Sequence, residues 1–127
     1  MYFQLAQSYF FFERILESAN NYFNIEDYQV YSAEERQELI NADTFRTNAF
    51  LLIPQLERNE IAIKYLTEKN NQKLLRKREH KDFYQRFHWY TEDNYLVDDW
   101  NSFEKSELIT FASMWCEQNQ IEFTTGG

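Results

Sequence analysis

The chain has 127 residues, a formal net charge of −8 and an aromatic content of 19%. This length suits one domain with its own core, and the many large rings exclude disorder over most of the chain. The net charge argues against anionic membranes and naked nucleic acid as partners of the whole protein.

Cysteine usage and the N-terminal apolar run bear on the compartment. Cys116 is the only cysteine, so no internal disulfide can form, and we expect a cytoplasmic protein in which this thiol is a small core residue. Glu13 and Arg14 cut the N-terminal apolar run far short of a membrane span, and no basic flank precedes it. We therefore expect neither a signal peptide nor a transmembrane helix.

Charge is distributed in three blocks. Residues 1–57 contain 9 Asp/Glu and 3 Lys/Arg, residues 58–86 contain 4 and 9, and residues 87–127 contain 8 and 1. The blocks therefore carry −6, +5 and −7. Such a pattern is typical of a surface that meets another macromolecule.

The first part of the chain has helical spacing. Apolar residues from Leu5 to Phe23 recur at steps of three and four and predict a helix over residues 4–22. Its wide apolar face suits a core helix and leaves a homodimer interface open. Residues 24–31 lack this spacing and are expected to form a loop or a short extended segment.

A second helix is expected to begin at a capping box. The Ser32 hydroxyl can accept from a free backbone N–H while Glu35 reaches back to the Ser32 amide. This helix is expected to pause near residues 41–43 and to be followed by another helical segment. Pro54, the only proline, should end or kink that segment.

The remaining elements are also predicted to be mostly helical. Residues 59–69 and 72–89 are expected to form two helices, and residues 91–101 an ordered surface loop that mixes acids with rings. Asn101 is expected to begin the last helix. Residues 121–123 are compatible with a brief strand or a packed tail.

These elements predict an all-α fold: a single-domain bundle of about five helices over residues 1–125, with room for one short strand or extended segment. Residues 126–127, two glycines, are expected to be a frayed or added tail. No motif assigns the chain to a known family.

Several chemistries lack their sequence motifs. No glycine precedes residue 126, so there is no glycine-rich phosphate loop, and no Cys or His spacing supports structural zinc. His80, Tyr84 and His88 would share a face on one continuous helix, which keeps a small helical enzyme as an alternative. The two histidines would then lie about 12 Å apart, too far to share one ion without other ligands. We expect no catalytic residue, metal or cofactor.

The acidic segment with interleaved rings is the predicted partner-binding surface. Carboxylates on a helical scaffold can occupy Lys/Arg clefts that normally hold a phosphate backbone, and rings can anchor the contact. The alternative is that the rings belong to the core and the acids only solubilise the chain. The predicted surface residues are Glu92, Asp93, Tyr95, Asp98, Asp99 and Trp100.

A second candidate surface is basic. It admits three interpretations: a solvated helix face, a contact with acidic parts of this chain or a second copy, or a contact with nucleic-acid phosphate. Its residues are Lys73, Arg76, Lys77, Arg78 and Lys81.

The sequence thus favours a small acidic inhibitor that binds a nucleic-acid-processing enzyme, such as a phage-encoded anti-CRISPR or anti-restriction protein acting by steric block or nucleic-acid mimicry. An immunity protein that neutralises a basic toxin nuclease is the first alternative. The enzyme using His80 and His88, and a nucleic-acid binder using the basic helix 72–89, are the others.

Overall fold

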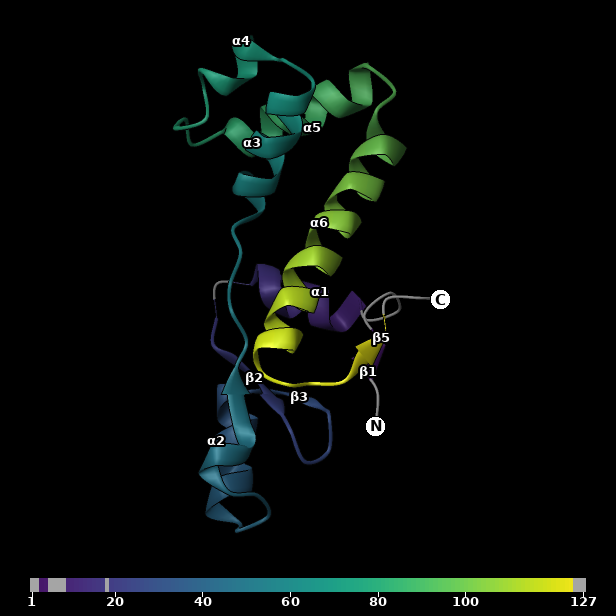
Figure 1. The fold of residues 1–127 in the computed structure, drawn as a ribbon. Coiled ribbons are helices and arrows are strands. Elements are labelled where there is room, and N and C mark those ends of the chain that lie inside the picture. Colours follow the sequence, from purple (N-terminus) through teal and green to yellow (C-terminus); the bar gives the residue numbers. More distant parts are fainter. Residues whose placement is uncertain (1–2, 5–8, 18, 125–127) are drawn as a thin grey trace. The chain divides into compact units, whose positions relative to one another are not determined.

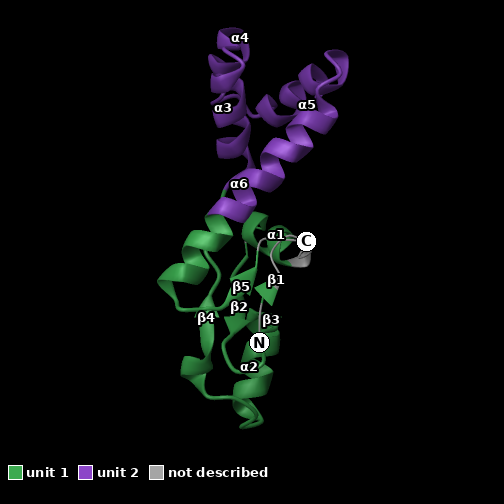
Figure 2. Cartoon of the chain, turned by 45° about the vertical axis from the view of Figure 1, so that its right-hand side comes forward, with its two compact units in different colours: residues 1–56, 111–127 green, residues 57–110 purple. Residues whose placement is uncertain are grey.

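The structure is a computed structural model that describes residues 3–4, 9–17 and 19–124. The chain divides into two compact units, coloured separately in Figure 2. Unit 1 comprises residues 1–56 and 111–127, and unit 2 comprises residues 57–110. Figure 1 labels the helices and strands along the chain.

Unit 1 combines short helices with short strands. Its elements are, in chain order, β1 (Phe3–Gln4), α1 (Tyr9–Leu16), β2 (Asn21–Asn24), β3 (Val30–Ser32), α2 (Ala33–Asn41), the 3-10 helix η2 (Thr47–Ala49), β4 (Phe50–Leu52), the end of α6 (Val97–Gln118) and β5 (Phe123–Thr124).

A three-stranded antiparallel sheet organises unit 1, with β2 between β3 and β4. Tyr22 pairs with Tyr31 on one side and with Leu52 on the other. The buried Asn24 shapes the turn after β2, because its side-chain oxygen accepts from the backbone N–H groups of Glu26 and Asp27. This Asx-type turn sends the chain back along β3.

The core of unit 1 is aromatic. The Phe3 ring lies 4.7 Å from that of Phe11 and 5.1 Å from that of Phe23, and Trp115 on α6 packs against both Phe11 and Phe23. Strand β1 pairs in parallel with β5, which joins the two ends of the described chain. Cys116 is fully buried beside this core, and burial raises the pKa of its thiol to about 11.

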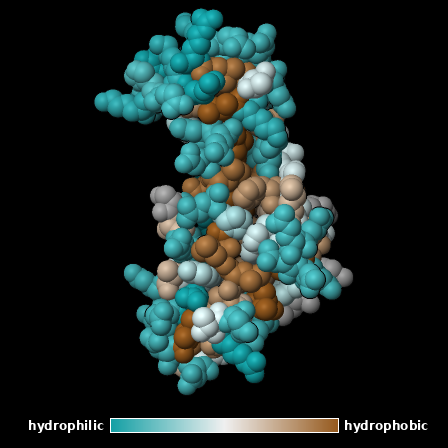
Figure 3. Space-filling view, turned by 60° about the vertical axis from the view of Figure 1, so that its left-hand side comes forward, coloured by the Kyte–Doolittle hydropathy of each residue, from teal (hydrophilic) through white to brown (hydrophobic). Residues whose placement is uncertain are grey.

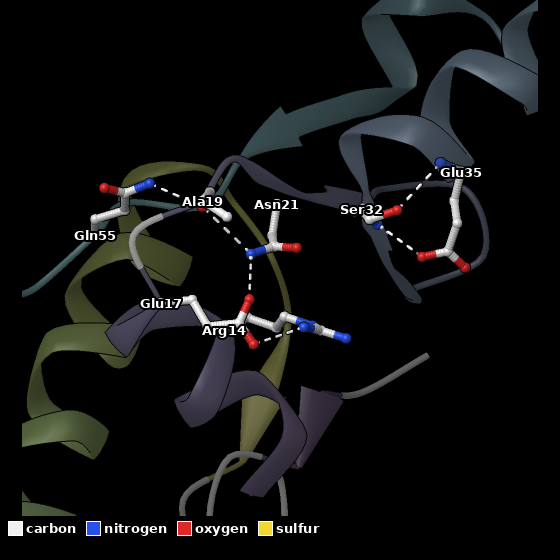
Figure 4. A network of polar contacts seen from close by, with 7 residues as sticks. All are labelled: Arg14, Glu17, Ala19, Asn21, Ser32, Glu35 and Gln55. Carbon is white, nitrogen blue, oxygen red and sulfur yellow. Dashed lines mark hydrogen bonds and ion pairs between the residues drawn. The ribbon is translucent and has the colours of Figure 1, made fainter.

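Polar contacts tie the segments around the sheet together (Figure 4). The Asn21 amide donates to Glu17 and to the backbone oxygen of Ala19, and Gln55 donates to the same oxygen at 2.8 Å. At the start of α2, the Ser32 hydroxyl accepts from the Glu35 N–H while the Glu35 carboxylate accepts from the Ser32 N–H. The capping box predicted from the sequence is therefore confirmed.

Unit 2 is helical in its described elements. They are α3 (Arg58–Glu68), α4 (Gln72–Leu75), α5 (Phe83–Asp93) and the first part of α6, up to residue 110. Its core contains Tyr65, Phe87 and Trp100, whose rings meet edge to face. The predicted helix over 59–69 is confirmed, with Ile61, Tyr65 and Leu66 buried as expected.

The predicted all-α fold is wrong, because the described residues hold six helices together with the three-stranded sheet and the β1–β5 pair. The helix predicted over 4–22 is α1 only, and β2 already begins at Asn21; residues 5–8 and 18 of that prediction lie outside the described residues. The predicted helical segment before Pro54 is η2 followed by β4. Strands β2 and β4 form by pairing with each other, which local spacing does not reveal.

Two boundaries in unit 2 also differ from the prediction. The helix expected over 72–89 is interrupted by turns between α4 and α5. The loop expected over 91–101 is reduced to residues 94–96, because α5 extends to Asp93 and α6 begins at Val97. The single-domain interpretation of residues 1–125 stays a prediction, and residues 126–127 lie outside the described part.

Four helices end in the same way despite the lack of glycine. In each, a residue with positive φ follows the helix, and the next N–H bonds back to the carbonyl five residues earlier, as in a Schellman motif. These bonds run from Thr44 to Leu39, Asn71 to Leu66, Leu96 to Thr91 and Ile121 to Cys116. The positive-φ residues are Asp43, Asn70, Tyr95 and Gln120.

Candidate functional site

The predicted acidic surface lies where α5 ends and α6 begins. Glu92 and Asp93 occupy the last turn of α5, Tyr95 the connecting turn, and Asp98 and Asp99 the first turn of α6. Acids in a first helical turn also stabilise the helix, because its N-terminus carries partial positive charge. The six predicted residues divide into two groups, those used inside unit 2 and those left at its surface.

Asp99 belongs to the first group. The Tyr65 hydroxyl donates to Asp99 Oδ2 at 2.6 Å, and Lys69 Nζ lies 3.0 Å from the same oxygen. The hydrogen bond from Tyr65, and then the one from Lys69, lower the pKa of the Asp99 carboxyl below its usual range. Asp99 therefore connects α6 to α3, and its charge is already compensated within the unit.

Trp100 also belongs to the first group. It is 4% exposed, and its ring lies 4.6 Å from that of Phe87 and 5.4 Å from that of Tyr65. Because α6 begins at Val97, Trp100 falls on the same helical stripe as the buried Leu108. This places Trp100 in the core of unit 2 rather than on the partner-binding surface.

Asp99 is exposed as well as paired, and four further exposed residues have no such role inside unit 2. They define the α5–α6 surface: Glu92, Asp93, Tyr95 and Asp98. Glu92 lies 3.5 Å from His88, whereas Asp93 and Asp98 have no side-chain hydrogen bond or ion pair with any described residue. Trp89 (55% exposed) and Val97 add apolar surface on the two helices that carry these acids. Whether this surface binds a partner stays a prediction.

Tyr95 is the unusual member of the α5–α6 surface. It is 95% exposed, its φ is 56°, and its side chain contacts no described residue through a hydrogen bond or ring packing. Tyr28 also has positive φ, but its ring packs on Phe23 and its hydroxyl accepts from Glu122 N–H. The fold thus explains the tyrosine at position 28, whereas nothing inside the described structure explains the one at position 95.

The predicted basic residues do not share one long helix. Lys73 lies on α4, while Arg76, Lys77, Arg78 and Lys81 lie in the turns between α4 and α5. Lys77 is half-buried and the other four are exposed. None of the five forms an ion pair with a described residue.

The two histidines are not brought together on one helix. His80 lies in the turns before α5, where its Nδ1 is 2.5 Å from Asp82 Oδ1, whereas His88 lies within α5. Arg86 donates to the same carboxylate at 2.9 Å, and Arg86 first and His80 second lower the pKa of Asp82. In the described part of the chain, no group of three or more His, Cys, Asp or Glu side chains is arranged to hold a metal ion.

A cluster around Glu104 was not anticipated from the sequence. Arg58 Nε lies 3.6 Å from Glu104 Oε2, and this oxygen is buried without a hydrogen bond from any described residue. Burial raises the pKa of Glu104, which Arg58 and then His88 partly oppose. The Arg58 guanidinium also lies over the Tyr84 ring, and burial raises the pKa of Tyr84. Glu104 and Trp100 lie four residues apart, so they share one face of α6. This spacing could have predicted that Glu104 is partly buried, but only if the helix had been expected to begin before Trp100.

The described cavities are small. One of about 350 Å³ in unit 1 is lined by Glu26, Ile40, Asp43, Thr44, Phe45, Arg46 and Thr47. Another of about 230 Å³ in unit 2 is lined by Gln72, Leu75, Arg76, Arg78 and Glu79. The second cavity shares two arginines with the predicted basic surface.

Comparison with known protein families, curated proteins and solved structures finds no significant match. Among the described residues, no helix combines the length and the apolar character needed to cross a membrane.

Proposed function

We propose that the chain is a non-catalytic binding protein whose α5–α6 surface docks onto a basic protein cleft that otherwise holds nucleic acid. The observation that carries this proposal is Tyr95, which is 95% exposed on a backbone conformation unfavourable for any residue with a Cβ. Residues in such conformations cluster at binding sites, and exposed tyrosines are frequent anchors of interfaces.

The charges around Tyr95 define the partner. Glu92, Asp93 and Asp98 surround it in sequence, and two of these three acids have no ionic partner among the described residues. An unpaired carboxylate beside an exposed ring suits a Lys/Arg-rich surface, since opposite charge speeds encounter and an aromatic anchor slows release. A cleft that holds a phosphate backbone has this chemistry, and occupying it would inhibit the enzyme.

The test begins with capture of partners by the tagged chain from a nuclease-treated lysate of the source cells. Each captured protein is then purified, and its binding is measured with wild type and variants. Tyr95→Ala is expected to weaken binding about 30-fold, because a tyrosine anchor contributes about 2 kcal/mol. Asp93→Lys with Asp98→Lys is expected to slow association and to reduce its dependence on salt.

The matched control reverses two exposed acids of unit 1, Glu38→Lys with Glu117→Lys, which changes the net charge by the same amount. If the control weakens binding as much as reversal of Asp93 and Asp98, net charge rather than the α5–α6 surface explains the affinity. If Tyr95→Ala and both reversals leave the affinity unchanged, the proposal is wrong. A captured toxin nuclease would indicate the immunity-protein alternative, and a CRISPR or restriction enzyme the favoured one.

A further inference from the structure

The basic residues of unit 2 divide into two sets by their pairing. Within residues 58–86, four of the nine Lys/Arg side chains form ion pairs with carboxylates of the same unit. Two of these pairs link α3 to α6, Arg58 with Glu104 and Lys64 with Glu107. A third joins Lys69, the residue directly after α3, to Asp99 on α6, and the fourth joins Arg86 to Asp82. Ion pairs within unit 2 therefore compensate every Lys and Arg of residues 58–86 except those of one short segment.

The other five cations all lie between residues 73 and 81, and none is paired with a described residue. Glu79 is the only acid among these nine residues. We call Lys73, Arg76, Lys77, Arg78 and Lys81 the basic segment. The positive charge of the basic segment is not compensated by ion pairs, whereas the other Lys and Arg side chains of residues 58–86 are paired.

The backbone of the basic segment is folded. Asn71 caps α4 by accepting from Leu74 N–H, and the buried Leu75 anchors the segment to the core. Beyond α4, Lys77 N–H bonds to Leu74 O at 2.9 Å and Arg78 N–H to Leu75 O at 3.3 Å. The cations therefore lie on a backbone that is already folded. Binding does not have to order this part of the main chain, which reduces its entropic cost.

The surface at this end of unit 2 is mixed. Figure 3 shows hydrophilic residues around a hydrophobic patch at the top of the view. Arg76 and Arg78 line the cavity of about 230 Å³ described above. Guanidinium groups present fixed pairs of donors that match phosphate oxygens, so two of them beside one depression suit a phosphodiester.

The net charge of the chain does not oppose this interpretation locally. Unit 1 contains 10 Asp/Glu and 3 Lys/Arg, whereas unit 2 contains 11 and 10. Nearly all of the excess negative charge, −7 of −8, thus belongs to unit 1. Unit 2 is therefore close to neutral, and its own charge does not oppose binding to nucleic acid.

We propose that the basic segment binds the phosphate backbone of a nucleic-acid strand. Exposed cations bind a single phosphate weakly, but a polymer engages several at once and releases its condensed counterions. This inference is independent of the α5–α6 surface. If both hold, the chain contacts the protein and the nucleic acid of one nucleoprotein complex.

The test is fluorescence anisotropy of the full chain with labelled probes of about 20 nucleotides: single-stranded RNA, single-stranded DNA of the same sequence and duplex DNA. Between about 50 and 200 mM salt, five phosphate contacts predict a slope of log affinity against log salt of about −3.5 on single strands and about −4.5 on duplex. A scrambled probe should bind equally well, since backbone contacts carry no sequence information. The probe that binds most tightly identifies the form of nucleic acid that the basic segment prefers.

The decisive variant neutralises Arg76, Lys77 and Arg78 to glutamine. It should weaken binding to every probe and make the slope on single strands less steep by about 2. The control, Asn48→Asp with Ser106→Glu and Gln118→Glu, changes the net charge equally at exposed positions outside the basic segment. It is expected to retain the wild-type slope.

Three results would overturn the inference. The first is no binding of wild type to any probe at about 50 mM salt, where backbone contacts are strongest. The second is an equal change of slope in the variant and the control. The third is binding of labelled polyglutamate in preference to all nucleic-acid probes, which would identify an acidic protein as the partner of the basic segment.

Discussion

Replacing Tyr95 by glycine tests the conformation of the turn between α5 and α6. Tyr95 has φ 56° and is followed by Leu96, whose N–H bonds to Thr91 O at 2.8 Å. A left-handed conformation costs a residue with a Cβ about 1–2 kcal/mol, because the Cβ approaches the following carbonyl. Glycine has no Cβ and is the usual residue at this position of a Schellman motif.

The magnitude follows from two opposing terms. Relief of the left-handed conformation contributes about 1–2 kcal/mol, and the greater freedom of glycine in the unfolded chain offsets about 0.5–1 kcal/mol. Loss of the ring adds almost nothing, because the side chain is 95% exposed. The expected net gain in the free energy of unfolding is roughly 0.5–1 kcal/mol, or a rise in Tm of about 2–5 °C.

The assay is urea unfolding followed by circular dichroism, with the midpoint and slope fitted for each variant. Tyr95→Gly should raise the midpoint without changing the slope, and Tyr95→Ala should leave both unchanged, because alanine keeps the Cβ. Asn70→Gly should give a smaller gain, since asparagine tolerates this conformation. A glycine variant no more stable than the alanine variant would refute the assignment of strain to Tyr95.

Four further predictions concern the polar contacts of unit 2 and the cooperativity of folding. Tyr65→Phe should lower the free energy of unfolding by about 1 kcal/mol and raise the pKa of Asp99 toward its ordinary value in an NMR titration. Because that pKa is lowered in the folded state, the contribution of Asp99 to the free energy of unfolding should be present above about pH 4 and lost as the pH falls. Asp99→Asn should therefore cost less stability at about pH 3 than at about pH 7. Glu104→Gln should behave in the opposite sense, because burial raises the pKa of Glu104. The variant should gain stability relative to wild type as the pH rises above about 4.5. A difference in stability between variant and wild type that does not change with pH would contradict the burial of this charge. If residues 1–125 are one folding domain, the slowest amides of β2 and α3 should exchange through the same opening, with one free energy in native-state hydrogen exchange; two distinct values would indicate separate domains.

Local signals predicted the elements that depend on neighbouring residues. The Ser32–Glu35 capping box and the stripe of Ile61, Tyr65 and Leu66 are visible within one or two turns of sequence, and the structure confirms both. The strands were missed because they are two to four residues long and gain their stability from partners elsewhere in the chain. The pairing of Phe3 with Phe123 is the extreme case, since no local pattern specifies it.

The candidate site was predicted only in part for a related reason. The start of α6 decides the side of the helix on which Trp100 lies, and an expected start at Asn101 hid its alignment with Leu108. The acids could be placed at the surface because charge resists burial whatever the fold, and Tyr95 only because it lies among them in the sequence. The pairing of Asp99 could not be foreseen, since it depends on the packing of α6 against α3.

The buried thiol near the end of α6 gives this chain a built-in probe of local opening. Cys116 has no exposed surface, and its pKa of about 11 keeps the sulfur protonated near neutral pH. A thiolate-specific reagent must therefore wait for an opening event that brings the sulfur into water. The rate of its modification, divided by that of a free thiol, measures how often the aromatic core of unit 1 opens, without any label being introduced.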